Sequence, residues 1–165
     1  MTEALDRLVD RVSDRVSKNY DLSKDKFICE FDESGAALYQ NKNEKLKIDF
    51  SVNKVEFTDI EVMDPRIVTI SPSSNNELHK HAHESIFYII KGFGEIVIGK
   101  DRIAANAGDI VFVPRWIFHQ SCNKSSREDL VILAITDFGL TSAVLGNYDK
   151  KTRLIDAGVD TMISN

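Results

Sequence analysis

Histidines are the residues of this chain best placed to do chemistry together. His79, His81 and His83 stand at alternate positions in "LHKHAHESIFYIIKGFG", and His119 follows later in "GDIVFVPRWIFHQSCN". Alternate side chains of an extended chain share a face, so His79 and His81 can point to one place, and a returning strand can bring His119 there. Imidazole is a good ligand for first-row transition metals. The spacing therefore predicts a metal site held by His79, His81 and His119.

Short extended segments must position these histidines. From about Phe27 onward, apolar and polar residues alternate in runs separated by "SPSSNN", "GFG", "GKD" and "NAGD". Regular short strands punctuated by glycine, proline and asparagine are typical of a small sandwich or barrel. We therefore expect an all-β fold, with strands in "KLKIDFSVNKVEF", "RIVTIS", "SIFYIIKG", "GEIVIG", "DIVFVP", "IFHQSCN" and "LVILAIT".

Both ends of the chain have a different pattern. Apolar residues recur at helical spacing in "TEALDRLVDRVSDRVSKNY", with charges on the opposite face, which predicts an amphipathic helix. This helix either docks on its own domain or contacts a partner. The expected organisation is a helical extension over residues 1–25, a barrel over 26–140, and a short helix with a polar tail over 141–165.

Composition excludes several classes of partner. The net charge is −5, from 21 basic and 26 acidic residues, so no basic surface for nucleic acid or anionic lipid is expected. The acidic start "MTEALDRLVD" has no apolar core typical of a secretory signal, and no apolar run approaches the roughly 20 residues of a membrane span. The 2 cysteines form no disulfide framework. We therefore expect a cytoplasmic protein.

The region around the first histidines resembles the cupin superfamily, whose members are double-stranded β-helix (jelly-roll) barrels. Its first motif begins with glycine, contains a His-x-His pair and a glutamate, and closes on glycine. Here His79 and His81 form the pair and Gly92 is the closing glycine. Ser85 stands at the glutamate position, and Ser73 stands where the motif opens.

The second cupin motif is nearly complete. Gly108, Pro114, His119 and Asn123 match it in register, and Trp116 replaces its inner glycine. The resemblance covers about residues 65–137 and implies a jelly-roll barrel with a mononuclear metal. The stretch "VPRWIFHQSCN" is similar to the corresponding part of gentisate-type cupin dioxygenases, some of which use three-histidine iron centres.

Serine at position 85 has three possible interpretations. The site could be degenerate and bind no metal. Glu84 could replace the acid, although its parity points it to the other face of the strand. The site could instead be a true three-histidine centre, which the retention of His79, His81 and His119 favours. Neutral ligands would leave a divalent metal its full charge and favour a chelating anionic substrate.

Neighbouring residues are candidates for contact with a substrate. Ser85 can hydrogen-bond a metal-bound water or a substrate, and His83 is either a supporting donor or solvent-exposed. Phe87 shares the parity of Ser85 and should point into the barrel. Arg115 and Trp116 lie beside His119 at the expected barrel mouth, where Arg115 could bind a carboxylate or simply be a surface residue.

The favoured function is that of an Fe(II)-dependent oxygenase, most simply a dioxygenase, that acts with O₂ on a small anionic molecule. Zn, Mn, Ni or Cu are the other metals such a site accepts. The alternatives are an isomerase or lyase that uses the metal as a Lewis acid, and a cupin that binds a small molecule without catalysis. A homodimer is expected, by analogy with the sheet pairing common among cupins.

Overall fold

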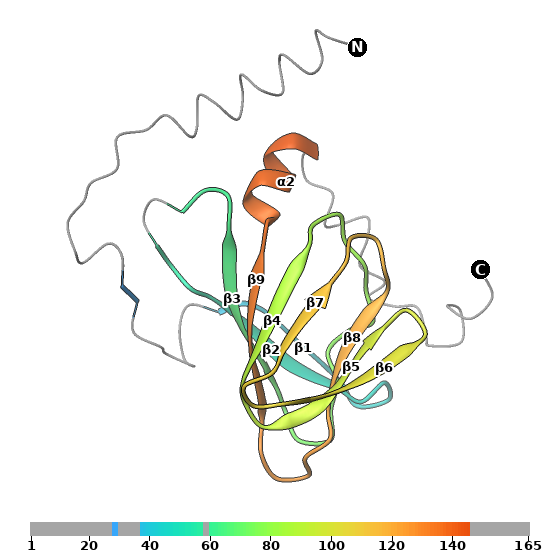
Figure 1. Ribbon diagram of the computed structural model, residues 1–165. Coiled ribbons are helices and arrows are strands. Elements are labelled where there is room, and N and C mark those ends of the chain that lie inside the picture. Colours follow the sequence, from blue (N-terminus) through green and yellow to red (C-terminus); the bar gives the residue numbers. More distant parts are fainter. Residues whose placement is uncertain (1–27, 30–36, 58–59, 146–165) are drawn as a thin grey trace, which may run out of the picture.

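The computed structural model describes residues 28–29, 37–57 and 60–145. These form an all-β domain followed by one short helix, so the sequence-based prediction of an all-β jelly-roll is confirmed (Figure 1). The predicted N-terminal helix and the C-terminal tail lie outside the described residues. Within the described ranges no helix is long and apolar enough to cross a membrane.

The strands form two antiparallel sheets that face each other. The larger sheet has the order β1-β2-β3-β9-β4-β7, and the smaller has the order β6-β5-β8. The bounds are β1 Ala37–Asn43, β2 Ile48–Lys54, β3 Asp64–Ile70, β4 Ser85–Lys91, β5 Phe93–Ile98, β6 Asp101–Asn106, β7 Ile110–Val113, β8 His119–Asn123 and β9 Leu130–Thr136. Helix α2, Phe138–Leu145, follows β9 at one end of the barrel (Figure 1).

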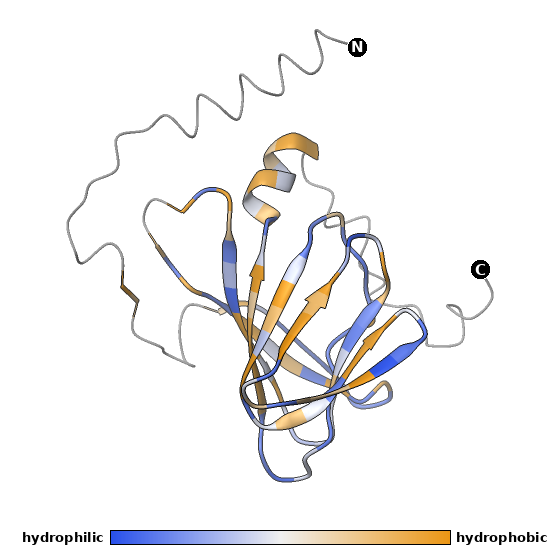
Figure 2. Cartoon of the chain, in the orientation of Figure 1, coloured by the Kyte–Doolittle hydropathy of each residue, from blue (hydrophilic) through white to orange (hydrophobic). Residues whose placement is uncertain are grey.

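Alternation within the strands places the core between the two sheets. In β4, Ser85, Phe87 and Ile89 are buried, whereas Ile86 and Tyr88 between them are exposed. The same period of two appears in β2 and β9, whose inward residues are mostly aliphatic. Figure 2 shows β9 and its neighbours β4 and β7 mainly in the orange of hydrophobic residues. Ile70, Ile89, Ile96 and Leu130 have no exposed surface. Removal of this apolar area from water stabilises the barrel.

Two glycines between strands are fixed by close backbone contacts. A Cβ on Gly92 would lie 2.5 Å from the carbonyl oxygen of Asp129, and one on Gly94 would overlap the carbonyl of Cys122. No side chain fits at either place without moving backbone. These glycines allow β4, β5, β8 and β9 to approach one another at the turn from the larger to the smaller sheet.

Ser73 and Trp116, which stand where the cupin motifs have glycine, keep a glycine-like backbone. Ser73 has a φ of 55° and Trp116 a φ of 58°, both in the left-handed region. Residues with a Cβ adopt this conformation at a cost of about 1–2 kcal/mol. The turns are therefore retained although the glycines are not.

The exposed Ser73 provides a test of this strain. Ser73→Gly should raise the free energy of unfolding by about 0.5–1 kcal/mol, because relief of the left-handed penalty exceeds the greater entropy of glycine in the unfolded chain. Urea unfolding would measure it. Ser126→Gly is the control: this exposed serine has no positive φ, so glycine should destabilise there. Equal effects of the two variants would contradict the interpretation.

Candidate metal centre

His79 and His119 are placed side by side by backbone pairing. Residue 79 lies outside the named strands, but its amide donates to the carbonyl of His119 at 3.1 Å, and the amide of His119 donates back at 2.9 Å. An antiparallel bridge therefore joins the segment before β4 to the first residue of β8. The two imidazole centroids lie 4.4 Å apart. The returning strand expected from the sequence is thus β8.

His81 is held by the loop that follows β7. The amide of Trp116 donates to the carbonyl of His81 at 2.8 Å, which fixes the backbone of that histidine opposite the start of β8. Its ring lies 4.6 Å from the ring of His119 and 5.4 Å from that of His79. The left-handed turn at Trp116 therefore helps to set the position of a candidate ligand.

Backbone carbonyls orient the three imidazoles. Nδ1 of His79 lies 2.8 Å from the carbonyl oxygen of Glu77, Nδ1 of His81 lies 2.9 Å from that of His83, and Nδ1 of His119 lies 2.9 Å from that of Ile117. A carbonyl only accepts, so each Nδ1 carries a proton, and in a neutral imidazole the lone pair then lies on Nε2. Metal-ligating histidines commonly have this arrangement.

The positions of the ring nitrogens and the burial of His119 also fit a metal. One nitrogen from each of His79, His81 and His119 forms a group whose members all lie within 4.8 Å of one another, close enough to converge on one ion. Nε2 of His119 is buried and has no hydrogen-bond partner within the described part of the chain. Burial lowers the pKa of His119, and its backbone hydrogen bond to Ile117 opposes that shift. The imidazole is therefore kept in the neutral form that binds metals.

Ser85 occupies the cavity wall beside the histidines. It is the first residue of β4, where it pairs with Thr136 of β9 and Val113 of β7. Its hydroxyl oxygen is buried and, like Nε2 of His119, has no hydrogen-bond partner in residues 28–29, 37–57 and 60–145. Burial of a polar group without a partner costs about 1–3 kcal/mol, so such groups commonly mark a place where a ligand binds.

One cavity contains the whole group. Its volume is about 70 Å³. The apolar part of the wall comes from β2, β3, β4 and β9, and polar residues come from the segment before β4, from β8 and from single positions on β3, β4 and β9. The lining residues are Phe50, Val52, Arg66, Val68, Asn76, Glu77, His79, His81, His83, Ser85, Phe87, His119, Ala134 and Thr136.

The other candidates from the sequence occupy different places. Phe87 lines the cavity, with its ring 6.3 Å from that of His119. His83 is buried and stacks on His81 at 3.5 Å between centroids, so it supports a candidate ligand and is not solvent-exposed. Trp116 is 48% exposed and does not line the cavity.

Arg115 also lies outside the cavity. Its Nη2 donates to Asp137 at 2.7 Å and its Nε lies 3.3 Å from Glu84. Asp137 in addition accepts from the amide of Glu84 at 2.8 Å. Arg115 thus ties the loop after β7 to the junction of β9 and α2. Glu84 is engaged there, on the side away from the histidines, in agreement with its parity.

Sequence reasoning missed Arg66 and Glu77, which both line the cavity. Glu77 is buried, and its carboxylate accepts hydrogen bonds from the hydroxyl of Tyr39 and from Nδ2 of Asn41, the latter at 2.5 Å. Arg66 comes from β3 and pairs with Asp64. The available signal for Glu77 was its parity with His79. Arg66 could have been found from the same alternation in "DPRIVTI", where it shares a face with Val68 and Ile70.

Comparison with known proteins agrees with this architecture. The cupin domain model matches residues 66–136. A cupin-2 domain protein from Rhodospirillum rubrum superposes with a TM-score of 0.56 at 22% identity, over 66% of this chain and 74% of that one. Salicylate 1,2-dioxygenase from Pseudaminobacter salicylatoxidans superposes with a TM-score of 0.54 at 11% identity, over 58% of this chain and 28% of that one. Both likenesses concern the fold.

A curated relative is also similar in sequence. The 1-hydroxy-2-naphthoate 1,2-dioxygenase of Nocardioides sp. (strain KP7) is 24% identical over 95 residues, which cover 58% of this chain. The match spans 24% of that enzyme's length. Together, the domain match over residues 66–136, the jelly-roll barrel and the converging histidines support a place for this protein in the cupin superfamily.

Proposed function

We propose that the protein is an Fe(II)-dependent dioxygenase that acts on a small anionic substrate. The observation that carries the proposal is the set of three imidazoles, His79, His81 and His119, grouped in a cavity where Ser85 replaces the usual acid. The similarity to 1-hydroxy-2-naphthoate 1,2-dioxygenase supports an oxidative reaction. Iron, when bound, supplies redox chemistry and open coordination positions for substrate and O₂.

The protein's own contribution is charge and orientation. Because its candidate ligands are neutral, a divalent ion would keep both positive charges, whereas a carboxylate ligand would neutralise one. An anionic substrate is therefore attracted to the site. The backbone carbonyls of Glu77, His83 and Ile117 hold the imidazoles in one orientation, so little reorganisation is needed on binding. The buried hydroxyl of Ser85 remains available as a donor to substrate.

The test is oxygen consumption by protein loaded anaerobically with Fe(II). The substrates would be hydroxy-, amino- and thiol-carboxylates together with salicylate, and product mass would be followed alongside O₂. We expect O₂ uptake in a fixed ratio to substrate, with both oxygen atoms found in the product. Zn(II)-loaded protein is the control and should consume none.

Other outcomes would support the alternatives. Substrate turnover by the zinc-loaded protein without O₂ would instead indicate an isomerase or lyase with Lewis-acid chemistry. Binding of these molecules without any turnover would favour a cupin that binds without catalysis. Either result would contradict the dioxygenase.

A further inference from the structure

Arg66 lines the cavity that contains the histidines. It is on β3, and the strand register places Ala134 of β9 opposite it and Phe87 of β4 next in the same row. These residues face the interior and line the cavity. Ala134, which lies between Arg66 and Phe87, has only a methyl side chain and so extends less far into the cavity than either neighbour. The space between Arg66 and the metal site is therefore left open by a small side chain.

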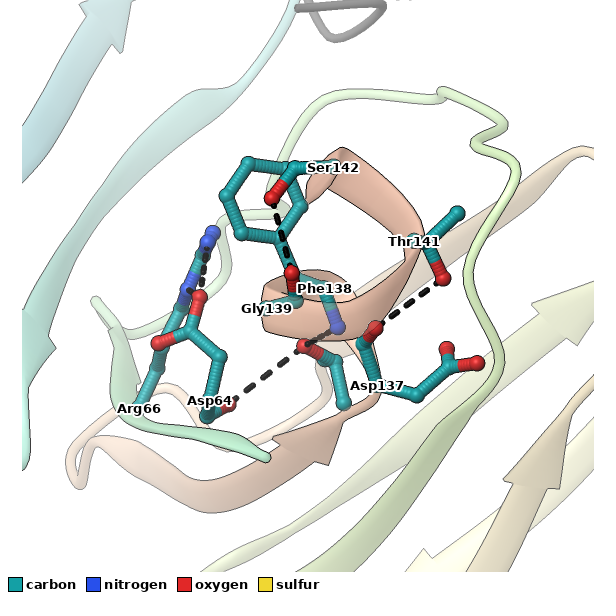
Figure 3. Close-up of polar contacts among 8 residues, drawn as sticks. Asp64, Arg66, Asp137, Phe138, Gly139, Thr141 and Ser142 are labelled. Carbon is teal, nitrogen blue, oxygen red and sulfur yellow. Dashed lines mark hydrogen bonds and ion pairs between the residues drawn. The ribbon is translucent and has the colours of Figure 1, made fainter. Parts of the chain in front are cut away.

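The guanidinium of Arg66 is held in a fixed orientation. Its Nε and Nη2 both donate to Oδ2 of Asp64, at 2.9 and 2.5 Å. Its central carbon lies 5.0 Å from the centroid of the Phe138 ring on α2. Figure 3 shows Asp64 on one edge of the guanidinium and Phe138 close by. The side chain is only 12% exposed, so Arg66 is a built part of the cavity wall.

Part of this guanidinium has no partner. Arginine has five N–H donors in a planar fork, and the printed contacts with Asp64 use Nε and Nη2. Nη1 donates to no group in the part of the chain that the structure describes. An oriented guanidinium with unused donors beside a cavity matches the two oxygens of a carboxylate. Asp64 balances the charge of Arg66, so hydrogen-bond geometry rather than bulk charge would select the ligand.

The size of the cavity restricts the ligand further. A volume of about 70 Å³ is about half of the roughly 150 Å³ of an engineered cavity that holds benzene. A short aliphatic carboxylate matches this space, whereas a fused aromatic ring exceeds it and would extend beyond it. The volume therefore favours a ligand smaller than the aromatic substrate named for the naphthoate dioxygenase.

We propose that Arg66 anchors the carboxylate of a short aliphatic substrate, of the size of glycolate or lactate, whose second donor group faces His79, His81 and His119. This inference rests on the proposed function for the location of the substrate, but not on its reaction with O₂. It makes Arg66 the residue that decides between carboxylates and neutral analogues, and it makes Ala134 the residue that provides room for them.

The experiment is calorimetric titration of the full-length Zn(II)-loaded protein, which binds without redox turnover. The probes are lactate, lactamide and 1-hydroxy-2-naphthoate. We expect wild type to bind lactate more tightly than either other probe. Arg66→Gln should weaken lactate binding about 10- to 100-fold, because a charge-assisted hydrogen bond is lost, and should change lactamide binding little. Arg66→Lys, which keeps the charge without the fork, should recover part of the affinity.

Controls separate anchoring from folding. Arg66→Gln leaves Asp64 unpaired, so the double variant Asp64→Asn/Arg66→Gln is measured beside it and should show the same loss of lactate affinity. Arg102→Gln removes another arginine from an ion pair, with Glu95 in the smaller sheet, and should bind lactate as wild type does. Zinc content and thermal unfolding of each variant would show that the barrel and metal site are intact.

The proposal is overturned if Arg66→Gln binds lactate like wild type, if lactamide loses as much affinity as lactate, or if 1-hydroxy-2-naphthoate binds wild type more tightly than lactate. Loss of lactate binding in Arg115→Gln with Arg66→Gln unaffected would place the anchor at the loop after β7 instead. If the iron-loaded protein takes up no O₂ but the expected binding pattern is found, the proposed dioxygenase activity is refuted, and the proposed role of Arg66 in binding a carboxylate stands.

Discussion

His119→Ala is expected to abolish stoichiometric metal binding, with a loss of affinity of more than about 100-fold, because even partners that only orient a ligand cost 10- to 100-fold when removed. Two imidazoles would remain, and alanine keeps the backbone bridge between residues 79 and 119. The buried Nε2 of His119 has no hydrogen-bond partner among the residues that the structure describes, so alanine removes an unsatisfied polar atom and folding should persist. Metal content after dialysis, and titration of Zn(II) into the apoprotein, would measure the effect.

His83→Ala is the matched control for that variant. His83 is buried like His81 and His119 and stacks on His81, but its ring is not in the converging group. Its carbonyl, which orients Nδ1 of His81, is retained in the alanine variant. Near-stoichiometric metal is therefore expected. Metal retained by His119→Ala, or lost equally in both variants, would refute the assignment of ligands.

Ser85→Glu should separate metal binding from activity. A carboxylate at this position restores the acid of the motif, and its anionic oxygen should hold a divalent metal at least as tightly as wild type. Activity toward an anionic substrate should nevertheless fall more than about 10-fold, because one unit of charge is neutralised and one coordination position is filled. Zinc affinity and Fe(II)-dependent O₂ uptake are the two measurements.

Ser85→Gln controls for the size of the new side chain. Glutamine fills nearly the same space of the small cavity but is neutral and is a poorer ligand, so no gain in zinc affinity is expected. Unchanged turnover in Ser85→Glu would show that position 85 does not face the metal. Higher metal occupancy in a protein without any activity would instead indicate a degenerate site.

Local patterns predicted the barrel and the histidine group because both depend on short-range geometry. Alternation in "SIFYIIKG" determines which side chains of β4 are buried, and so places Ser85 and Phe87 on the inner face. His79 and His81 share a face for the same reason. To predict that His119 joins them, the sequence analysis needed the second motif. A hydrogen-bonded bridge between residues so distant in sequence cannot be derived from either segment alone.

Alternation in "DPRIVTI" puts Arg66 on one face with Val68 and Ile70, but it does not show that this face lines the cavity of the histidines. Arg66 and Asp64 lie on β3, which crosses to β9 rather than to a strand that follows it directly in sequence. Nothing in "DPRIVTI" shows which strand will pair with it. Arg115 was the arginine nearest His119 in sequence, but Glu84 and Asp137 hold it outside the cavity. Nearness in the chain was a poor guide because the sheet order, not the sequence order, determines the walls.

The glycine positions of this barrel differ in how much a side chain would destabilise the fold. Gly92 and Gly94 are constrained by atoms that a side chain would strike, so no single substitution there is neutral. Ser73 and Trp116 hold positions constrained only by φ, where a side chain costs a modest amount of energy that the rest of the fold tolerates. Gly108 belongs with them, since a Cβ there would meet nothing within 4 Å. A search pattern for distant homologues should therefore demand glycine at the crowded positions and allow other residues at the uncrowded ones.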